Sequence, residues 1–446
     1  MKQKLTTFLF GVFSLTTFAQ ESEVKVLPKE IQSPQAYLDS IKQTFVNHKA
    51  GAMLDKKWIN ELLNDDMFTN METDINNVYL DEDVTYNLPT DVLKARLEAL
   101  DKKYPFDITY SPTLEKVIKN FLKNRSKSFE RLMGLSDYYF PMFEEHLAKH
   151  NVPLEIKYLA IVESALNPKA KSRVGATGLW QFMYPTGKQY GLDVTSYIDE
   201  RSDPLKSTDA AAEYLADLYK VFGNWEMVLA SYNSGPGTVS KAIRRSGGKT
   251  NYWQIREYLP KETQGYVPAF LATLYVYEYH KEHGIVPQKA NVPFIKTDTV
   301  HLKRAMTFED VSDLLDISVD EIKILNPKYK TDKIPNYEDK MHTLRLPLDK
   351  ISKFTSNERT IYAYLDYQNN YKIEKNILDE IISENNTAIA ANKSKNKVSS
   401  KTHVVKRGDT LSAIAKKYGN VTVAQLMKKN NIKNASSLKP GMKLKI

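Results

Sequence analysis

The chain has 446 residues, too many for one ordinary hydrophobic core, so two or three globular units joined by linkers are expected. It contains no cysteine, which excludes disulfides, thiolate metal sites, a cysteine nucleophile and the lipid-modified cysteine of a bacterial lipoprotein. Lysine and arginine number 63 against 54 acidic residues, a net charge of +9 that favours an anionic partner such as nucleic acid, acidic lipid or cell-wall polymer.

The first residues have the pattern of a signal peptide. Lys2 and Lys4 precede an apolar stretch that ends at Phe18, and Ala19 is a small residue where a signal peptidase cleaves. A short membrane anchor is the alternative, but the stretch is shorter than the roughly 20 residues a spanning helix needs. We therefore predict a cleaved signal peptide at residues 1–19, no integral membrane segment afterwards, and a periplasmic or cell-wall location. Export also argues against nucleic acid as a partner.

Residues 20–125 are polar and contain acidic stretches, and Pro89, Pro105 and Pro112 interrupt any long helix. The sequence assigns this region no role. The pattern changes at about residue 126, where helical periodicity and strong stop signals begin and continue to 285. This part is predicted to be a compact α-helical domain.

Several helices of that domain can be located. Val152, Ile156 and Leu159 share one apolar face of a helix reaching Leu166, and Glu163 continues the same face. Further helices are expected from the Ser207-Thr208-Asp209 start to Gly223, from Trp225 to about Tyr232, and over an apolar segment ending at Gly284.

Four ordered motifs in this region carry a family resemblance. They are Glu163-Ser164-Ala165-Leu166-Asn167-Pro168, the stretch from Ser172 through Gly175-Ala176-Thr177-Gly178-Leu179-Trp180-Gln181-Phe182-Met183, Ser231-Tyr232-Asn233-Ser234-Gly235, and Glu262-Thr263-Gln264-Gly265-Tyr266-Val267. Their order and spacing resemble the lytic transglycosylase domain, and most closely the membrane-bound transglycosylase D subfamily. Trp180, Tyr184 and Ser231 depart from its commonest residues.

The resemblance implies a mainly α, lysozyme-like catalytic domain that acts on peptidoglycan glycan strands without a metal or other cofactor. It implies that Glu163 protonates the departing glycosidic oxygen and then accepts the proton of the muramic acid 6-hydroxyl, leaving a 1,6-anhydro end. The family's cleft residues map to Ser172, Gln181, Met183, Tyr232, Asn233 and Tyr266, although Tyr266 can also be interpreted as a core aromatic. Gly175 and Gly178 either let the backbone approach a ligand or form a structural turn.

The position of Glu163 supports such a role on physical grounds. A carboxyl group on an apolar helix face is partly desolvated, which disfavours its charged form and raises its pKa. An acid that keeps its proton near neutral pH can protonate a breaking glycosidic bond. The alternative is a structural glutamate paired with a lysine.

Most glycosidases use a second carboxylate, and Asp199, Glu200, Asp203 and Glu262 are the candidates. We interpret them as structural. The first three lie in a loop where side chains bond the backbone and Arg201 pairs with a neighbouring acid. Glu262 falls in the first turn of the last helix, where the dipole favours negative charge.

The C-terminal part contains a weak internal repeat. His403 to Ala415, with its Gly408-Asp409-Thr410 turn, and Leu438 to Leu444 resemble a LysM domain, which implies a small α/β module at 402–446 binding N-acetylglucosamine. Residues 298–348 resemble a degenerate copy, because Val319, Ile322 and Asn326 align with Val423, Leu426 and Asn430. Residues 372–401 are expected to be a linker, whose stretch from Asn385 to Lys401 suits a flexible tether.

Two weaker signals are set aside. Gly248-Lys249-Thr250 lacks the first glycine and preceding strand of a phosphate-binding loop. His280 and His283 lack a plausible third metal ligand. The alternatives to a lytic transglycosylase are a hydrolysing muramidase and an inactive peptidoglycan-binding scaffold; protein partners, oligomeric state and the choice between endo and exo cleavage stay open.

Overall fold

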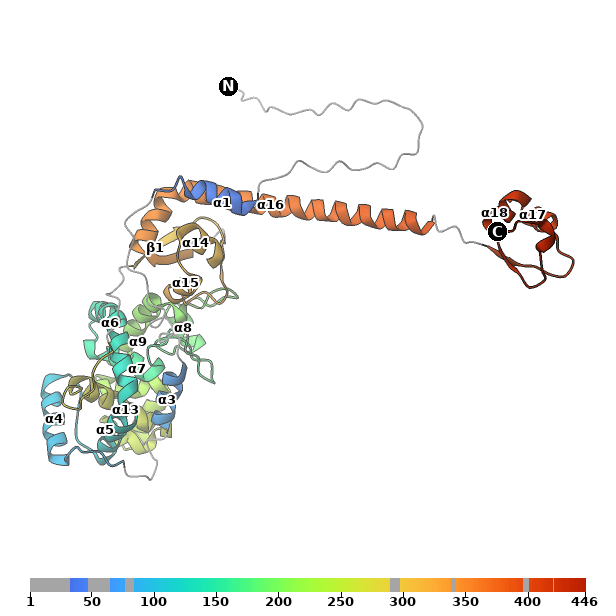
Figure 1. The fold of residues 1–446 in the computed structure, drawn as a ribbon. Coiled ribbons are helices and arrows are strands. Elements are labelled where there is room, and N and C mark those ends of the chain that lie inside the picture. Colours follow the sequence, from blue (N-terminus) through green and yellow to red (C-terminus); the bar gives the residue numbers. More distant parts are fainter. Residues whose placement is uncertain are drawn as a thin grey trace, which may run out of the picture. The chain divides into compact units, whose positions relative to one another are not determined.

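The computed structural model describes residues 33–46, 65–76, 84–288, 297–337, 342–395, 401–419 and 421–446 (Figure 1). The chain is mainly α-helical, with short strands in its C-terminal third, which confirms the predicted fold class. The predicted signal peptide at residues 1–19 lies outside the described residues. Within the described ranges, no helix has both the length and the apolar character that crossing a bilayer demands.

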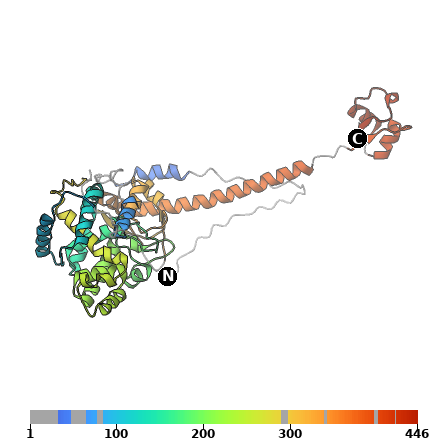
Figure 2. The same cartoon turned by 90° about the horizontal axis from the view of Figure 1, so that it is seen from below.

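The central helical domain is built around α13, which is buried along most of its length. Both views show the helices of this domain gathered into one bundle (Figures 1 and 2). Its elements are α3 (Asp65–Asn76), α4 (Thr90–Lys103), α5 (Pro112–Asn124), α6 (Ser126–Lys149), η1 (Leu154–Tyr158), α7 (Leu159–Ser164), α8 (Tyr184–Gln189), η2 (Glu200–Ser202), α9 (Pro204–Phe222), α10 (Trp225–Ser234), α11 (Pro236–Arg245), α12 (Tyr252–Ile255), η3 (Arg256–Tyr258) and α13 (Lys261–Glu278).

Local sequence signals explain most helix ends, with two corrections. Helix α9 ends at Gly223 as predicted, but it begins at Pro204 because the Asp203 side chain accepts hydrogen bonds from the first backbone N–H groups. Ser207 therefore lies inside the helix and donates to the Asp203 carbonyl oxygen. Helix α13 ends at Glu278, earlier than predicted, and Gly284 belongs to a following turn in which its φ is 68°.

The predicted boundary at residue 126 does not separate two cores. Helix α5 packs along α13 and buries Leu114, Ile118 and Phe121, while α3 contacts both α13 and α7. Residues from Met67 onward therefore share one hydrophobic core with the domain. Polar composition concealed this, because helices that cover one side of a core need only one apolar stripe.

Residues 297–347 form a second, smaller core. Strands β1 (Thr297–Leu302) and β4 (His342–Pro347) pair antiparallel, from Thr297 with Pro347 to Leu302 with His342. Strands β2 (Met306–Thr307) and β3 (Lys333–Ile334) form another pair, and the helices are α14 (Phe308–Leu315) and α15 (Val319–Leu325). Helix α1 (Pro34–Lys42) and the start of α16 (Leu348–Lys395) join this core through Leu38, Ile41, Phe354 and Ile361, so the module extends beyond the predicted 298–348.

The predicted linker at 372–401, with its flexible tether from Asn385 to Lys401, differs from the structure as far as residue 395, because residues 372–395 continue α16 as a helix. Residues 396–400 lie outside the described residues. The physical reason is composition: the segment from 348 to 395 contains no glycine or proline, and its alanine, glutamate and lysine residues are good helix formers. Absence of aromatic residues near its end indicated lack of a packed core, but this is compatible with a solvent-exposed helix.

The C-terminal module has its own core and contains β5 (Thr402–Val404), α17 (Leu411–Tyr418), α18 (Val423–Lys429), η4 (Ala435–Ser437) and β6 (Lys443–Lys445). Matching hydrogen bonds confirm the internal repeat. Asn430 bonds the Leu426 carbonyl and both backbone groups of Lys445, and Asn326 does the same with Ile322 and Arg345.

Candidate active site

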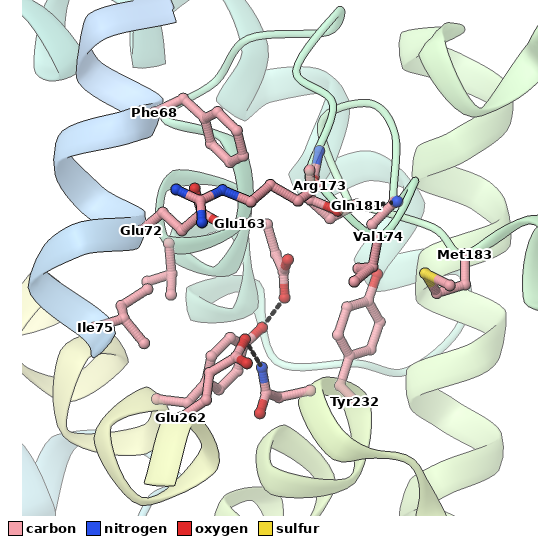
Figure 3. Close-up of a pocket in the computed structure, with 15 residues that line it drawn as sticks. Phe68, Glu72, Ile75, Glu163, Arg173, Val174, Gln181, Met183, Tyr232 and Glu262 are labelled. Carbon is pink, nitrogen blue, oxygen red and sulfur yellow. Dashed lines mark hydrogen bonds between the residues drawn. The ribbon is translucent and has the colours of Figure 1, made fainter. Parts of the chain in front are cut away.

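A cavity of about 330 Å³ opens in the central helical domain, and Glu163 points into it (Figure 3). Its walls come from α3, α7, α10, α13 and the loop that precedes α8. All seven residues predicted for the site line this one cavity. The lining residues are Phe68, Glu72, Ile75, Val162, Glu163, Ser172, Arg173, Val174, Ala176, Gln181, Met183, Tyr232, Asn233, Glu262 and Tyr266.

Glu163 is held by a short and unusual helix end. Helix α7 stops at Ser164, and Ala165 and Leu166 have φ values of 50° and 63°, a left-handed conformation that costs free energy in residues with a Cβ. The buried Ser164 hydroxyl contacts the carbonyl oxygens of Ala160 and Leu179, each at 2.9 Å. The bond to Leu179 ties the glutamate-bearing helix to the loop that precedes α8.

Burial and two neighbours set the protonation of Glu163. Loss of hydration raises its pKa to about 8. The Tyr266 hydroxyl donates a hydrogen bond to Glu163 Oε1 and lowers the pKa, while the negative charge of Glu262 raises it. Among the described residues Glu163 makes no ion pair with a lysine or arginine, and its side-chain partner there is Tyr266. Near neutral pH this carboxyl group is mostly an acid.

The loop from Ser172 to Met183, hereafter the cleft loop, depends on two glycines with a φ of 90°. A Cβ on Gly178 would lie 1.9 Å from the Arg201 carbonyl oxygen, whereas a Cβ on Gly175 would meet nothing within 4 Å. The close approach at Gly178 is therefore to the protein's own backbone, which favours the structural-turn alternative over the predicted approach to a ligand.

Gln181, which was predicted as a cleft residue, lines the cavity but also bonds the protein's own backbone. Its Nε2 donates to the carbonyl oxygens of Ala170 at 3.1 Å and Gly178 at 2.9 Å. Since both amide hydrogens are used by the loop, Nε2 holds the cleft loop in shape. Ser172 behaves similarly, because its Oγ accepts from the Ala176 N–H at 3.0 Å.

Tyr232 and Asn233, which line the cavity, also form hydrogen bonds with other protein groups. Tyr232 lines the cavity and donates its hydroxyl hydrogen to the Trp180 carbonyl oxygen at 2.7 Å. Asn233 accepts from Thr263 Oγ1 at 2.7 Å and donates to Glu262 Oε1 at 3.2 Å. Met183, with 42% of its surface exposed, is accessible for contact.

The four other acids were predicted to be structural. Arg201 makes two charge-assisted bonds to Asp199, at 2.9 and 2.7 Å; Glu200 pairs with Lys206; and Asp203 caps α9. Glu262 lies in the first turn of α13, as predicted. It also lines the cavity, so it is the acid of this set that could reach a bound molecule.

Sequence reasoning missed the α3 side of the cavity. Phe68, Glu72 and Ile75 form this wall, and the Arg173 side chain reaches from the cleft loop toward it, while Val174 lies near Gln181 and Tyr232 (Figure 3). A signal was present, because Met67, Phe68, Met71 and Ile75 follow helical spacing and are all buried. Among the described residues, no group of three or more metal-ligating side chains is placed to hold a metal ion.

Three parts of the chain match known domain families. Residues 140–255 match the transglycosylase SLT domain, residues 296–363 match the LysM-like domain of lytic transglycosylase MltD, and residues 403–446 match the LysM domain. The helical domain that carries Glu163 is therefore an SLT-type transglycosylase domain.

Relatives extend the match over most of the chain. Membrane-bound lytic murein transglycosylase D of Escherichia coli (strain K12) is 32% identical over 337 residues, which cover 74% of this chain and 67% of the relative. The chain belongs to the lytic murein transglycosylase D family. Soluble lytic murein transglycosylase of the same strain is 34% identical over 148 residues, covering 32% of this chain and 23% of the relative. The crystal structure of the 70 kDa soluble lytic transglycosylase from Escherichia coli matches with 22% identity and a TM-score of 0.30, covering 58% of this chain and 46% of that chain.

Proposed function

We propose that the protein is a lytic transglycosylase that cleaves the β-1,4 bond between N-acetylmuramic acid and N-acetylglucosamine in peptidoglycan and leaves 1,6-anhydro ends. The observation that carries this proposal is Glu163, a carboxyl group with a raised pKa in the cavity of an SLT domain. At pH 7, a pKa of about 8 means roughly ten acid groups for each carboxylate.

The proposed reaction uses one protein carboxyl group twice. Glu163 first donates its proton to the glycosidic oxygen as the bond from that oxygen to the anomeric carbon breaks, and the substrate's acetamido group stabilises the positive charge on this carbon. The resulting carboxylate then accepts the proton of the muramic acid 6-hydroxyl, while the oxygen of that hydroxyl bonds to the anomeric carbon. No water is consumed, and Glu163 regains its proton.

Tyr266 and Glu262 both assist this cycle, through opposite effects on the pKa of Glu163. The Tyr266 hydroxyl donates to Glu163 and stabilises the carboxylate formed after the first step. The nearby charge of Glu262 favours the protonated form that starts the cycle. The pKa of Glu163 is thus held between the needs of an acid and a base, as general acid–base catalysis requires.

The modules suggest where the enzyme acts. We propose that the C-terminal LysM module binds N-acetylglucosamine units of the glycan, and that the protein is exported and works on the cell wall. In its described residues, Asp409 is the sole acid among many lysines, which also favours an anionic wall surface.

Mass spectrometry of products released from purified sacculi tests this function. Wild-type protein should release anhydro-muropeptides, and Glu163→Gln should reduce their release by at least about 100-fold, the usual contribution of a general acid. Glu145→Gln, which changes an exposed glutamate on α6, is the matched control and should behave as wild type.

Other products would contradict the proposal. Reducing-end products would identify a hydrolysing muramidase, and their loss in Glu262→Gln would identify its second carboxylate. Binding to sacculi without soluble products from wild-type protein would identify an inactive scaffold.

A further inference from the structure

The two LysM-type modules differ at one turn. Thr307 and Thr410 occupy the same place, because each caps the first helix of its module. The preceding residues are Lys-Arg-Gly-Asp in the C-terminal module and Lys-Arg-Ala-Met in the module at 297–347, hereafter the LysM-like module. Asp409 is partly exposed, whereas Met306 is 2% exposed and pairs with Ile334 in the β2–β3 ladder. The LysM-like module thus has a buried apolar residue directly before the cap of its first helix where the C-terminal module has an acid, while Lys303, Arg304 and Ala305 stay exposed.

The loop facing this turn is longer in the LysM-like module. The equivalent asparagines bond to the last strand 19 residues further on in the LysM-like module and 15 residues further on in the C-terminal one. This longer loop contains β3 and the segment from Lys328 to Lys330. This segment packs against the central helical domain.

Main-chain hydrogen bonds join the two parts. The Asp199 N–H donates to the Lys328 carbonyl oxygen at 2.8 Å, the Lys330 N–H donates to the Tyr197 carbonyl oxygen at 2.9 Å, and Ile198 pairs with Tyr329. Residues from each part are also buried in the core of the other part. Ile198 belongs to the core of the LysM-like module, while Ile324 and Leu325 of α15 belong to the core of the helical domain.

Lys328 lies at the centre of this contact and is 8% exposed. Its Nζ pairs with Asp203 Oδ2 at 3.0 Å and donates to Thr343 Oγ1 at 2.7 Å. Both side chains of the ion pair are largely removed from water, at 10% and 13% exposure, so loss of the lysine would leave a buried carboxylate unpaired.

The contact continues to the active site through Arg201. This residue is two positions from Asp203, is held by the buried Asp199 carboxylate, and donates from Nη1 to the carbonyl oxygens of Gly175 at 3.0 Å and Phe182 at 3.1 Å. Those two carbonyls lie on the cleft loop, which carries Ser172, Gln181 and Met183. The bonded path from the LysM-like module to the cavity wall runs through the main-chain bond between Lys328 and Asp199, the Asp199–Arg201 ion pair and the two Arg201 bonds to the cleft loop. Asp203 adjoins this path in the chain, and its N–H donates to the Glu200 carbonyl oxygen at 3.0 Å.

We propose that the LysM-like module is a fixed part of the catalytic unit, and that Lys328 is a positioning residue that holds the cleft loop through Asp203, Asp199 and Arg201. In this role the module acts on the geometry of the cleft rather than on the cell wall. The inference rests on the proposed function, since it assigns the module a task in that reaction.

The test is Lys328→Met in the full chain, which keeps the apolar stem and removes the charge. With soluble uncross-linked peptidoglycan strands as substrate, we expect kcat to fall about 10-fold or more, because small displacements of a cleft wall are costly in rate. Lys328→Arg keeps the positive charge and should therefore retain most of the wild-type kcat. Hydrogen–deuterium exchange should accelerate in residues 172–183, while exchange in α10 and α13 stays unchanged.

Lys416→Met, which removes an exposed lysine of the C-terminal module, is the matched control and should leave both readouts unchanged. Wild-type rate and exchange in Lys328→Met would overturn the inference, as would faster exchange spread evenly over the helical domain, which marks general destabilisation. If Lys328→Met does not fold, Thr343→Val removes one partner of Lys328 Nζ and should give the same local exchange. Hydrogen–deuterium exchange is measured without substrate, so it tests the role of Lys328 independently of the reaction. The comparison of wild type with Glu163→Gln tests the proposed reaction. Either proposal can therefore fail while the other stands.

Discussion

Glu163→Gln should make the protein more stable at alkaline pH while it abolishes activity. In the folded protein the pKa of Glu163 is raised from 4.5 to about 8, mainly by burial. Between these pH values the folded state holds a proton that the unfolded chain has released. The free energy of unfolding therefore falls as pH rises through this window, and the neutral amide of glutamine removes that fall.

The size of the effect follows from the shift. A change from 4.5 to about 8 corresponds to at most about 5 kcal/mol at 1.36 kcal/mol per pKa unit. Because the carboxyl group faces an open cavity, water reduces this, and we expect roughly 2 to 3 kcal/mol. The variant and wild type should be nearly equal at pH 4.5, and the gap should widen up to pH 8 and then stay constant.

Urea unfolding followed by tryptophan fluorescence measures this gap in the relevant domain. All four tryptophans precede residue 254, and Trp180, Trp225 and Trp253 lie in or against the core around α13. Glu145→Gln should track wild type at every pH. A difference between Glu163→Gln and wild type that does not change between pH 5 and pH 8.5 would refute the reasoning that burial keeps this carboxyl group protonated.

Three further outcomes are expected. The pH profile of kcat/KM should show a one-proton decline near pH 8. Tyr266→Phe should move that decline to higher pH, because it removes the hydrogen-bond donor that lowers the Glu163 pKa. A decline at the same pH in Tyr266→Phe would contradict the assignment of the decline to Glu163. Ser231→Ala should raise stability by about 1 kcal/mol in urea unfolding, with activity retained, because the buried Ser231 hydroxyl has no hydrogen-bond partner among the described residues. Gly178→Ala should destabilise the domain by more than about 2 kcal/mol and remove activity, whereas Gly191→Ala, also at positive φ but in open space, should cost less in thermal denaturation and keep activity.

The residues that line the cavity were largely predictable because the signal is local and ordered. The motifs around Glu163, Ser172, Tyr232 and Tyr266 stand at fixed spacing, and the structure brings all of them to one cavity. What each side chain does was less predictable. Gln181 has the chemistry to bind sugar, but its Nε2 bonds two backbone carbonyls that only the folded loop places nearby.

Domain limits were harder to predict because they depend on long-range packing. Nothing in residues 65–125 indicates that α5 lies along α13, about 150 positions later in the chain, and an amphipathic helix gives no information about its partner. The same holds for α1, whose Leu38 and Ile41 complete the core of the LysM-like module. The repeat itself was visible, since equivalent asparagines leave a sequence trace before their hydrogen bonds are seen.

Three acids line the cavity, Glu72, Glu163 and Glu262, and the environment of Glu163 suits the proposed reaction with one catalytic carboxyl group. Glu163 is the desolvated one, whereas Glu262 is exposed at the start of α13 and accepts a hydrogen bond from Asn233. As a charge near Glu163, Glu262 raises the pKa of its neighbour and keeps the acid ready. A hydrolase of the two-carboxylate type needs its second group free to act as nucleophile or base. In the proposed reaction Glu262 instead helps to raise the pKa of Glu163, and the substrate's own hydroxyl is the nucleophile.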